Sequence, residues 1–395
     1  TFDQQLVRRG YAAEHHGRWH APLGPTECYS NEVTLKFFEP YRKYLGDRFG
    51  ELPKPKEGQF VETIFGWPYA PDAPDYQLRM SRNDPPPHGV PGVHYGIDES
   101  PEDATYTAFV ADETIRAIER HRDHPFSITA AFLAPHHPMV VTRRWAESVD
   151  PAKMTPPVSL NDKRLNTPYE NWPWQMDGTD MPAVNFIQAR YYAFVQEVDH
   201  HVGRILQTLD RLGLADDTLV IFISDHGEFL GDHGIAQKFL PYQEAVRIPM
   251  IMRLPGRIRA GSSVEHVANS IDLMATIADY LEFPCPAQEG RSLRPLVEGG
   301  THDYPEYTFS EFGWEEGYTM FASRDWKYVW TGDPKSVDLL FDLRADPQEL
   351  DNLLGTNPDR AKHVPQAGAI RETMLDWMQT IRHPYLERLS RSEVG

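Results

Sequence analysis

The chain has 395 residues, of which 40% are hydrophobic and 25% charged, a composition typical of a globular protein with a large core. Its formal net charge of −19 repels nucleic acids and anionic membranes, so we expect no nucleic-acid partner. The two cysteines, Cys28 and Cys285, are too few for a disulfide framework or a cysteine-rich metal site, and no apolar run is long enough for a membrane span.

Helices and strands alternate through most of the chain. Residues 1–10 predict the end of an amphipathic helix, because Phe2, Leu6 and Val7 share one face and Gly10 suits a C-cap. Residues 21–100 are rich in Pro, Gly, Tyr and Trp and indicate long loops and short helices. Apolar periodicity then predicts helices over 104–124, 185–213 and 270–281, and strands over 126–134, 218–224 and 248–255.

This alternation predicts an α/β fold with a mostly parallel central sheet sandwiched by helices. The run TLVIFIS (218–224) is apolar and rich in β-branched residues, which is typical of a strand buried on both faces. After residue 300 we expect short antiparallel strands within 307–311, 318–325, 327–331 and 338–343, and a helix over 364–382. The sequence therefore predicts a main domain of residues 1–300 and a smaller α+β domain of residues 301–395 with an antiparallel sheet.

The first segment with clustered polar residues is GYAAEHHGRWH (10–20). Arg18 and His20 are two residues apart, so they point the same way in an extended stretch. A guanidinium can hold a tetrahedral oxyanion with two hydrogen bonds. An exposed strand with scattered charge explains the same residues.

The second segment is APHHP (134–138), which follows a predicted strand. Its prolines stiffen the chain and fix the direction of His136 and His137. A histidine held at a strand end can donate a proton to a leaving group. Taken alone, the segment is better explained as a proline-rich surface turn.

The third segment is SDHGEFLGDHG (224–234), directly after the strand 218–224. Asp225 and His226 then stand at the carboxyl edge of the sheet, on a tight turn that Gly227 permits. A carboxylate and an imidazole in this place can bind a divalent cation. The alternative is a helix N-cap at Asp225 beside a solvated histidine.

Lys238 adds a positive charge just beyond this third segment, although most lysines are solvated surface residues. Together the three segments and Lys238 provide a cation-binding edge, histidines and fixed positive charges. Such a set suits an anionic tetrahedral ester, because a metal and cationic side chains stabilise charge on the transferred group.

In their order and spacing, these motifs resemble the sulfatase family of the alkaline-phosphatase-like superfamily. GYAAEHHGRWH is similar to the sulfatase segment G-Y-x-T-x-x-x-G-K-W-H, and PFSITAAFLAPHHP looks like the strand that ends in Pro-His-x-Pro. SDHGEFLGDHG, with the tail EAVRIPMIMRLPG, resembles the segment with the metal ligands and the substrate-binding lysine. GRSLRPLVEG (290–299) and DLLFDLRADPQELDNL (338–353) resemble the closing strands and the small C-terminal domain. The resemblance covers nearly the whole chain.

The resemblance implies a cation site and an ester-binding cation. Asp225 and His226 would be ligands of a divalent cation, with Ca²⁺ expected first and Mg²⁺ or Mn²⁺ as in relatives. Many sulfatases have asparagine in the place of His226. Lys238 would bind the ester and the oxygen of the leaving group.

The resemblance also implies roles for three residues of the first half of the chain. Arg18 matches the family lysine that holds the nucleophile and the sulfate, and arginine keeps the charge but alters the geometry. His136 would contact the sulfate and protonate the leaving oxygen. His20 would take a proton from the formylglycine hydrate and so release sulfate.

Two motifs of the family are absent from the sequence. The family's first strand ends in an Asp-Asp pair that binds the metal, and a following Cys-x-Pro-x-Arg provides the Cys or Ser that becomes formylglycine. Cys28 lacks the Pro and Arg, and Cys285 has Glu289 where Arg is required, so we interpret both cysteines as structural. We expect the nucleophile to lie in an N-terminal segment outside these residues, and this chain alone to have no sulfatase turnover.

The leading hypothesis is hydrolysis of a sulfate monoester, with a sulfated carbohydrate as the substrate by analogy with bacterial relatives. The alternative enzyme is a phosphodiester or phosphonate monoester hydrolase of the same superfamily, because those relatives share Asp-His-Gly-Glu. A third hypothesis is a truncated, non-catalytic relative that binds anionic sugars. The sequence leaves open the particular sulfated compound, the compartment and the oligomeric state, a homo-oligomer included.

Overall fold

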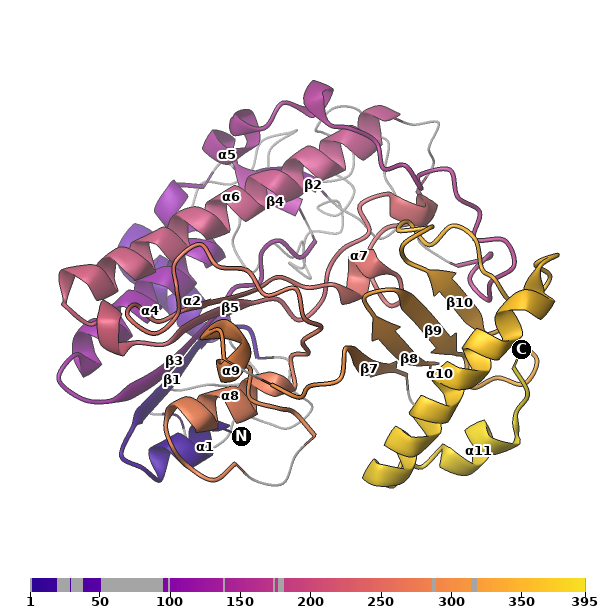
Figure 1. Cartoon of the computed structure of the whole chain (residues 1–395). Coiled ribbons are helices and arrows are strands. Elements are labelled where there is room, and N and C mark those ends of the chain that lie inside the picture. The colour runs from indigo at the N-terminus through magenta and orange to yellow at the C-terminus, as the bar shows by residue number, and fades with distance from the viewer. Residues whose placement is uncertain are drawn as a thin grey trace. The chain divides into compact units, whose positions relative to one another are not determined.

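The computed structural model describes most of the chain outside residues 51–94. The described residues are 2–19, 29, 38–50, 95–98, 100–137, 139–172, 175–176, 181–285, 289–300, 302–313 and 318–394. The chain divides into two compact units, residues 1–156 with 176–218 and residues 157–175 with 219–395. Figure 1 shows both units, with most of their helices and strands labelled.

The first unit is built on parallel strand pairs. β1 (Ala12–Gly17) pairs with β3 (Phe126–Ala131), and β2 (Tyr95–Asp98) pairs with β4 (Met139–Thr142). The helix α4 (Tyr106–His121) packs on both β1 and β3. The hydroxyl of Thr105 caps α4 by accepting a hydrogen bond from the Ala108 amide at 3.1 Å.

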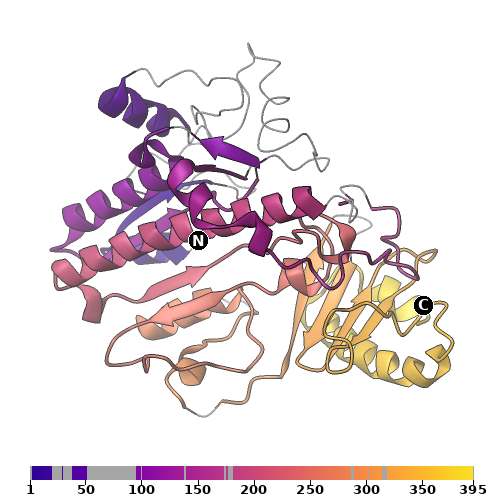
Figure 2. The same cartoon turned by 90° about the horizontal axis from the view of Figure 1, so that it is seen from above.

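A long helix, α6 (Met181–Arg211), packs against α4 and β4 in the same unit, and Figure 2 shows α4 and α6 side by side. Its small residues Ala189 and Ala193 form a buried cluster with Val141, Ala146 and Val149, which lets the neighbouring backbones approach closely. The other helical elements of the unit are α1 (Phe2–Val7), α2 (Phe38–Phe49), α5 (Arg143–Ser148), η1 (Glu102–Ala104), η2 (Pro151–Lys153) and η3 (Ala215–Asp217).

The helix α6 places one carboxyl group fully inside the first unit. Glu197 is 1% exposed and accepts a hydrogen bond from the Thr105 hydroxyl at 2.7 Å. Burial, together with the nearby carboxylates of Asp98 and Glu102, raises the pKa of Glu197 to about 8, and the Thr105 hydrogen bond offsets this only in part. Glu197 is therefore protonated in the folded protein at neutral pH.

Replacing Glu197 with glutamine should stabilise the protein at alkaline pH. The folded-state pKa of about 8 lies above the ordinary value of 4.5. The free energy of unfolding therefore falls as the pH rises from about 4.5 to about 8, and the loss is complete above that range. We expect the difference in unfolding free energy between Glu197→Gln and the wild type to grow by about 4 kcal/mol from pH 4.5 to pH 9 in urea titrations. A difference that does not change with pH would contradict a buried, protonated Glu197.

The second unit begins with an antiparallel pair, β5 (Val220–Ile223) and β6 (Met250–Arg253). The prediction that β5 is buried on both faces is wrong, because most of its side chains are half-buried and Phe222 is 37% exposed. Among the described residues β5 forms only a two-stranded ribbon with β6, and such a ribbon is too narrow to cover itself. The helical elements beside this ribbon in the sequence are η4 (Asp232–Gly234), α7 (Gln243–Val246), α8 (Asp272–Tyr280) and α9 (Arg294–Val297).

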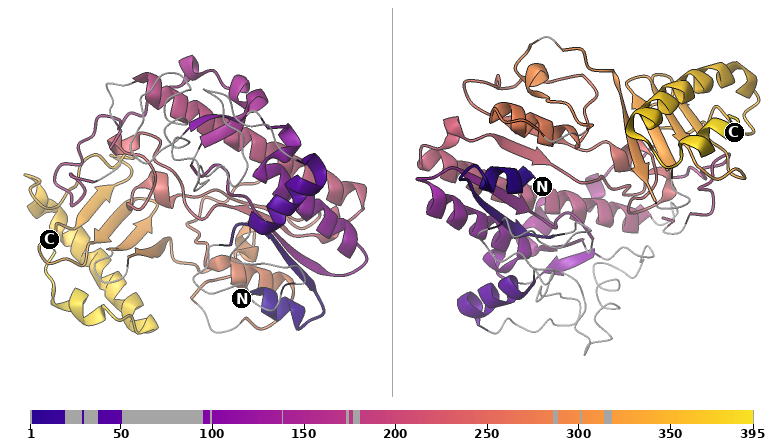
Figure 3. Two further views of the ribbon diagram at one scale, coloured as in Figure 1. Left: turned by 180° about the vertical axis from the view of Figure 1, so that it is seen from behind. Right: turned by 90° about the horizontal axis from the view of Figure 1, so that it is seen from below.

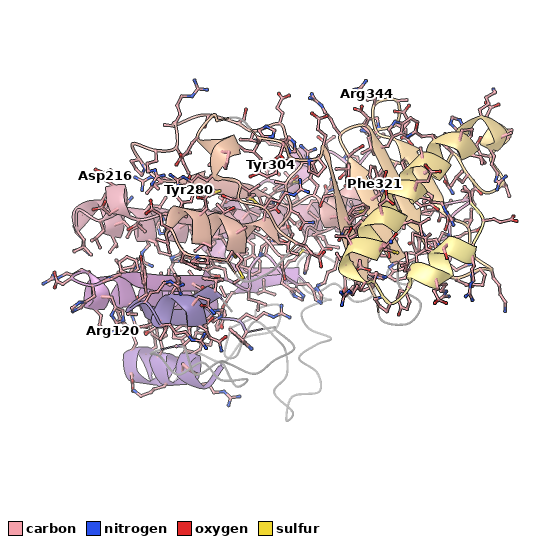
Figure 4. All side chains as sticks on the ribbon, turned by 60° about the horizontal axis from the view of Figure 1, so that its bottom comes forward. Arg120, Asp216, Tyr280, Tyr304, Phe321 and Arg344 are labelled. Atoms are coloured by element: carbon pink, nitrogen blue, oxygen red, sulfur yellow. The ribbon has the colours of Figure 1, made fainter. Side chains whose placement is uncertain are left out.

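The C-terminal part of the second unit is a four-stranded antiparallel sheet in the order β10-β9-β8-β7. One face of this sheet packs against two helices through Tyr328, Leu340 and Phe321, the last labelled in Figure 4. Figure 3 shows the two helices along that face. The strands and helices are β7 (Tyr307–Phe312), β8 (Tyr318–Ser323), β9 (Trp326–Trp330), β10 (Leu339–Asp342), α10 (Arg360–Ile381) and α11 (Leu386–Arg391).

The opposite face of the four-stranded sheet packs on the segment that follows β5. Alternate residues of the strands point to this face, and Met320 and Val329 lie here in one buried cluster with Phe229, Leu240 and Tyr242. Residues 229–245 are therefore supported by the sheet, and the sheet has two covered faces.

A buried ion pair fixes the same segment to the sheet. Lys327 of β9 is 0% exposed, and its Nζ lies 2.5 Å from Oε1 of Glu349. The same Nζ donates a hydrogen bond to the carbonyl oxygen of Pro241 at 2.9 Å, while Glu349 Oε2 accepts one from the Gln243 amide at 2.7 Å. Both charged side chains thus form hydrogen bonds with main-chain groups at the start of α7, which offsets the cost of burying the two charges.

The predicted α/β class is confirmed by the parallel pairs, the packed helices and the antiparallel C-terminal sheet. Helices predicted from apolar periodicity correspond to α4, α6 and α8, and Gly213 ends α6 with φ of 70°. The elements β2, β4 and α11 were not predicted, because they are short and lie in segments without clear periodicity. The domain boundary at residue 300 stays a prediction. In the part of the chain that the structure describes, no helix is long and apolar enough to cross a membrane.

Candidate active site

The carboxyl ends of β1 and β3 lie side by side in the first unit. Gly17 is opposite Ala131, and the amide of Arg18 donates a hydrogen bond to the carbonyl oxygen of Ala131 at 3.0 Å. The segments that carry Arg18 and His136 therefore leave the sheet at one edge, where α/β proteins bind ligands. His20, the other predicted residue after β1, lies outside the described residues.

His136 is held in a tight turn after β3. Its amide donates a hydrogen bond to the Leu133 carbonyl oxygen at 3.0 Å, and its ring stacks on the ring of His137 with centroids 4.3 Å apart. Nδ1 of His136 lies 2.6 Å from the His137 carbonyl oxygen, so Nδ1 carries a proton and any proton that the ring transfers moves on Nε2. His136 is half-buried and His137 buried, unlike residues of a freely solvated surface turn.

The turn after β5 orients Asp225 and His226. The His226 amide donates a hydrogen bond to Oδ1 of Asp225 at 3.0 Å, and the Ser224 hydroxyl donates one to the His226 carbonyl oxygen at 2.7 Å. Nδ1 of His226 donates to the Gly227 carbonyl oxygen at 2.8 Å, and Nε2 lies 3.7 Å from Oδ2 of Asp225. Residues 224–229 are not helical, so the helix N-cap interpretation of Asp225 is wrong.

Asp225 and His226 can offer two donor atoms to one cation. Carboxylate oxygens and imidazole nitrogens bind divalent ions at about 2.0–2.6 Å, so two atoms 3.7 Å apart can reach the same ion. The side chains are 76% and 33% exposed, which leaves both accessible to a ligand. Across the described ranges, no group of three or more His, Cys, Asp or Glu side chains could hold a metal, so the pair fits one part of a cation site.

Gly227 lets this turn approach α7 closely. Its amide donates a hydrogen bond to the Ala245 carbonyl oxygen at 2.8 Å, and a Cβ at Gly227 would lie 1.9 Å from the Glu244 carbonyl oxygen. A larger residue would push the two main chains apart. The position of Asp225 and His226 therefore depends on the main chain of residues 244–245.

Lys238 and Glu228 form a second charged feature of the same segment. Burial raises the pKa of Glu228 to about 7, and the charge of nearby Lys238 lowers it only in part. Lys238 is half-buried, and its Nζ lies 5.4 Å from the ring centroid of Phe239. The side chain is thus placed by its surroundings, unlike a solvated surface lysine.

Glu228 and His233 were not among the predicted site residues. Both lie inside the segment 224–234, and the Asp-His-Gly pattern of residues 225–227 recurs at 232–234, a signal that could have singled out His233. The His233 side chain is 0% exposed. Its burial arises from contacts with distant segments, which the local sequence does not reveal.

The structure brings the predicted site residues together in two groups. Arg18 and His136 follow neighbouring strands of the first unit, while Asp225, His226 and Lys238 share one continuous segment of the second. A meeting of the two groups around one cation and one anion stays a prediction.

Comparison with known proteins identifies the family. The sequence profile described as Sulfatase matches residues 5–283. The chain belongs to the sulfatase family. A second profile, described as N-sulphoglucosamine sulphohydrolase, C-terminal, matches residues 231–371 of this sulfatase chain.

Curated sulfatases are similar over much of the chain. A choline-sulfatase of Rhizobium meliloti (strain 1021) is 32% identical over 382 residues, which cover 89% of this chain and 67% of that protein. An arylsulfatase of Clostridium perfringens (strain 13 / Type A) is 28% identical over 267 residues, 63% of this chain and 54% of that protein. The chain thus spans only part of the length of these relatives. They support hydrolysis of sulfuric esters as the reaction of this sulfatase.

Solved structures of similar proteins confirm the alkaline-phosphatase-like fold. A phosphonate monoester hydrolase from Silicibacter pomeroyi has a TM-score of 0.74 at 23% identity and covers 96% of this chain and 80% of its own. A protein solved with its substrate D-glucosamine-2-N,6-O-disulfate has a TM-score of 0.71 at 17% identity and covers 97% of this chain and 82% of its own. At these identities the likeness establishes the sulfatase fold alone.

Proposed function

We propose that this chain forms the sulfate-binding and proton-donating part of a sulfatase that hydrolyses a sulfate monoester of a carbohydrate. The observation that carries the proposal is the turn 224–229, where Asp225 and His226 present two accessible donor atoms 3.7 Å apart at the end of β5. This turn lies inside the region that matches the sulfatase profile.

The family's divalent cation would be held in part by Asp225 and His226, and Ca²⁺ is the ion we expect first, with Mg²⁺ or Mn²⁺ as alternatives. When bound, such a cation supplies positive charge that polarises the sulfate group. The Nδ1 hydrogen bond of His226 to Gly227 orients its ring with Nε2 toward Asp225, as an outer hydrogen bond does for metal-binding histidines.

Arg18, Lys238 and His136 act on the ester itself in this proposal. Arg18 and Lys238 bind the sulfate oxygens, and their charges offset the negative field of the whole chain locally. His136 donates the proton on Nε2 to the leaving alcohol as the sulfur–oxygen bond breaks and the sulfuryl group passes to the nucleophile. His20 removes a proton in the step that releases sulfate.

The nucleophile of the proposed reaction is a formylglycine, made from Cys or Ser, in a segment outside these 395 residues. Neither cysteine here fits the role. Cys285 is a free thiol whose pKa is raised by burial, the opposite of an activated cysteine. Cys28 lies outside the described residues.

One relative supports a sulfated sugar as the substrate class. An N-acetylglucosamine-6-O-sulfatase of Bacteroides thetaiotaomicron is 32% identical over 177 residues, 42% of this chain and 31% of that protein. The main alternative, a phosphonate monoester or phosphodiester hydrolase, is favoured by the multifunctional alkaline phosphatase superfamily protein PehA of Trinickia caryophylli, 27% identical over 395 residues, 89% of this chain and 76% of that protein. The third hypothesis is a non-catalytic relative that binds anions.

Hydrolysis assays of the protein with its natural upstream sequence on nitrophenyl sulfate and nitrophenyl phenylphosphonate distinguish the three hypotheses. We expect kcat/KM to be at least about tenfold higher on the sulfate, and the 395-residue chain alone to show no turnover. A preference for the phosphonate would assign the alternative enzyme, and no turnover by the extended protein on either ester would assign the non-catalytic relative.

A further inference from the structure

His233 lies in a closed charged environment beside the proposed cation site. Its side chain is 0% exposed, its main chain has φ of 51°, and its ring stacks on Tyr242 with centroids 4.0 Å apart. The amide of His233 donates a hydrogen bond to the Ser159 hydroxyl at 2.9 Å, and its carbonyl oxygen accepts one from Arg164. Side chain and main chain are therefore both fixed.

The two ring nitrogens of His233 face carboxylates from two different segments. Nδ1 lies 2.8 Å from Oδ2 of Asp162, and Nε2 lies 3.5 Å from Oε2 of Glu244. These two carboxylates raise the pKa of His233 to about 9 against the effect of burial. A protonated ring can attract both at once, whereas a neutral ring carries only one N–H.

Further charged groups surround His233 and Glu244. Arg164 and Asp232 stand close to His233, and Lys327 lies close enough to Glu244 to help lower the pKa of its carboxyl group. His233 itself is the largest cause that lowers the Glu244 pKa after burial, which acts in the opposite direction. Glu244 is thus held ionised mainly by the ring of His233.

Glu244 connects this pair to the turn with Asp225 and His226. Its carbonyl oxygen would lie 1.9 Å from a Cβ at Gly227. The carbonyl oxygen of the next residue, Ala245, accepts a hydrogen bond from the Gly227 amide at 2.8 Å. A shift of Glu244 would move the surface on which the turn rests.

We propose that His233 is a positioning residue that holds Glu244 against Gly227 and so sets the affinity of the Asp225–His226 turn for a divalent cation. This inference rests on the proposed function of that turn. His233 makes no contact with the ester in this proposal; it acts through the ion pair and the main chain of residues 244–245.

The test measures Ca²⁺ affinity by calorimetry on the folded protein with its natural upstream sequence. In His233→Gln the Ca²⁺ dissociation constant should rise about tenfold, as expected for loss of a residue that orients metal ligands. Glu244→Gln, which keeps the main chain and the side-chain shape, should raise it similarly and serves if His233→Gln does not fold. His383→Gln is the matched control, because that ring is also largely buried, with 6% exposed, and pairs with Glu311 at 2.5 Å in the C-terminal part of the unit.

A pH series separates positioning from general loss of stability. The protonated ring of His233 stabilises its pairing with Glu244. This stabilisation is fully present below about pH 6.5 and is lost as the pH rises through about 9. The wild type should therefore bind Ca²⁺ several-fold more weakly at pH 10 than at pH 7.5, while Glu244→Gln should show no such fall.

Each outcome decides the inference. Raised Ca²⁺ dissociation constants in His233→Gln and Glu244→Gln, with the His383→Gln control unchanged, support the inference. Wild-type affinity in a folded His233→Gln or Glu244→Gln protein overturns the positioning role and leaves the proposed function intact. Absence of binding of all three ions, Ca²⁺, Mg²⁺ and Mn²⁺, by the wild type overturns both the inference and the proposed function.

Discussion

Replacing Asp225 with alanine should lower kcat/KM on a sulfate ester by on the order of 10³-fold. Of the two acidic residues in the turn 224–229, Asp225 is exposed and Glu228 is half-buried. Oδ2 of Asp225 lies 3.7 Å from Nε2 of His226. Without it, His226 is the one proposed cation ligand left among the described residues. The developing charge on the sulfate would then lose most of its electrostatic stabilisation. Steady-state kinetics with added Ca²⁺, and direct titration of Ca²⁺ binding, measure the two effects.

Asp216→Ala is the matched control for this variant. Asp216 is also an exposed aspartate, in η3 just before β5, and it is labelled in Figure 4. It should retain wild-type activity and Ca²⁺ affinity. An Asp225→Ala protein with more than a tenth of the wild-type kcat/KM and an unchanged Ca²⁺ dissociation constant would remove Asp225 from the cation site.

Replacing His136 with glutamine should slow hydrolysis in a way that depends on the leaving group. A sugar alcohol is a poor leaving group and needs the proton from Nε2 of His136, so kcat on a sulfated sugar should fall by about 10²–10⁴-fold. Nitrophenolate leaves without a proton, so kcat on nitrophenyl sulfate should fall by only about tenfold. Parallel assays of both substrates give the ratio directly.

His124→Gln provides the comparison for His136, because His124 is an exposed histidine just before β3. It should behave as the wild type on both substrates. An equal loss on the two substrates in His136→Gln would show that His136 binds sulfate without donating the proton to the leaving oxygen.

Much of the fold was predictable because it depends on local patterns. The alternation of side chains that puts Met320 and Phe321 on opposite faces of β8 is a period of two along the sequence. Helix ends such as Thr105 and Gly213 carry their own capping signals. The short strand β4 was missed because its four residues are buried throughout, so they show no alternation.

The candidate site was predictable only as motifs. Asp225, His226 and Lys238 stand out by type and spacing, and their segment keeps them together. The buried state of Glu228 and His233 was not predictable, because it is created by contacts with residues far away in the sequence, such as the pairing of His233 with Asp162. Two-sided burial of β5 was wrongly predicted because apolar residues also occur in a half-covered ribbon.

The proposed function requires that the group of Arg18 and His136 and the group of Asp225, His226 and Lys238 meet at one site. A crystal structure of the protein with its natural upstream sequence, grown with Ca²⁺ and inorganic sulfate, would test this requirement. We predict one Ca²⁺ ion bound by Asp225 and His226, next to one sulfate ion held within hydrogen-bonding distance of the remaining four residues, namely Arg18, His20, His136 and Lys238. Sulfate or Ca²⁺ bound elsewhere, with these side chains on separate surfaces, would overturn the proposed site.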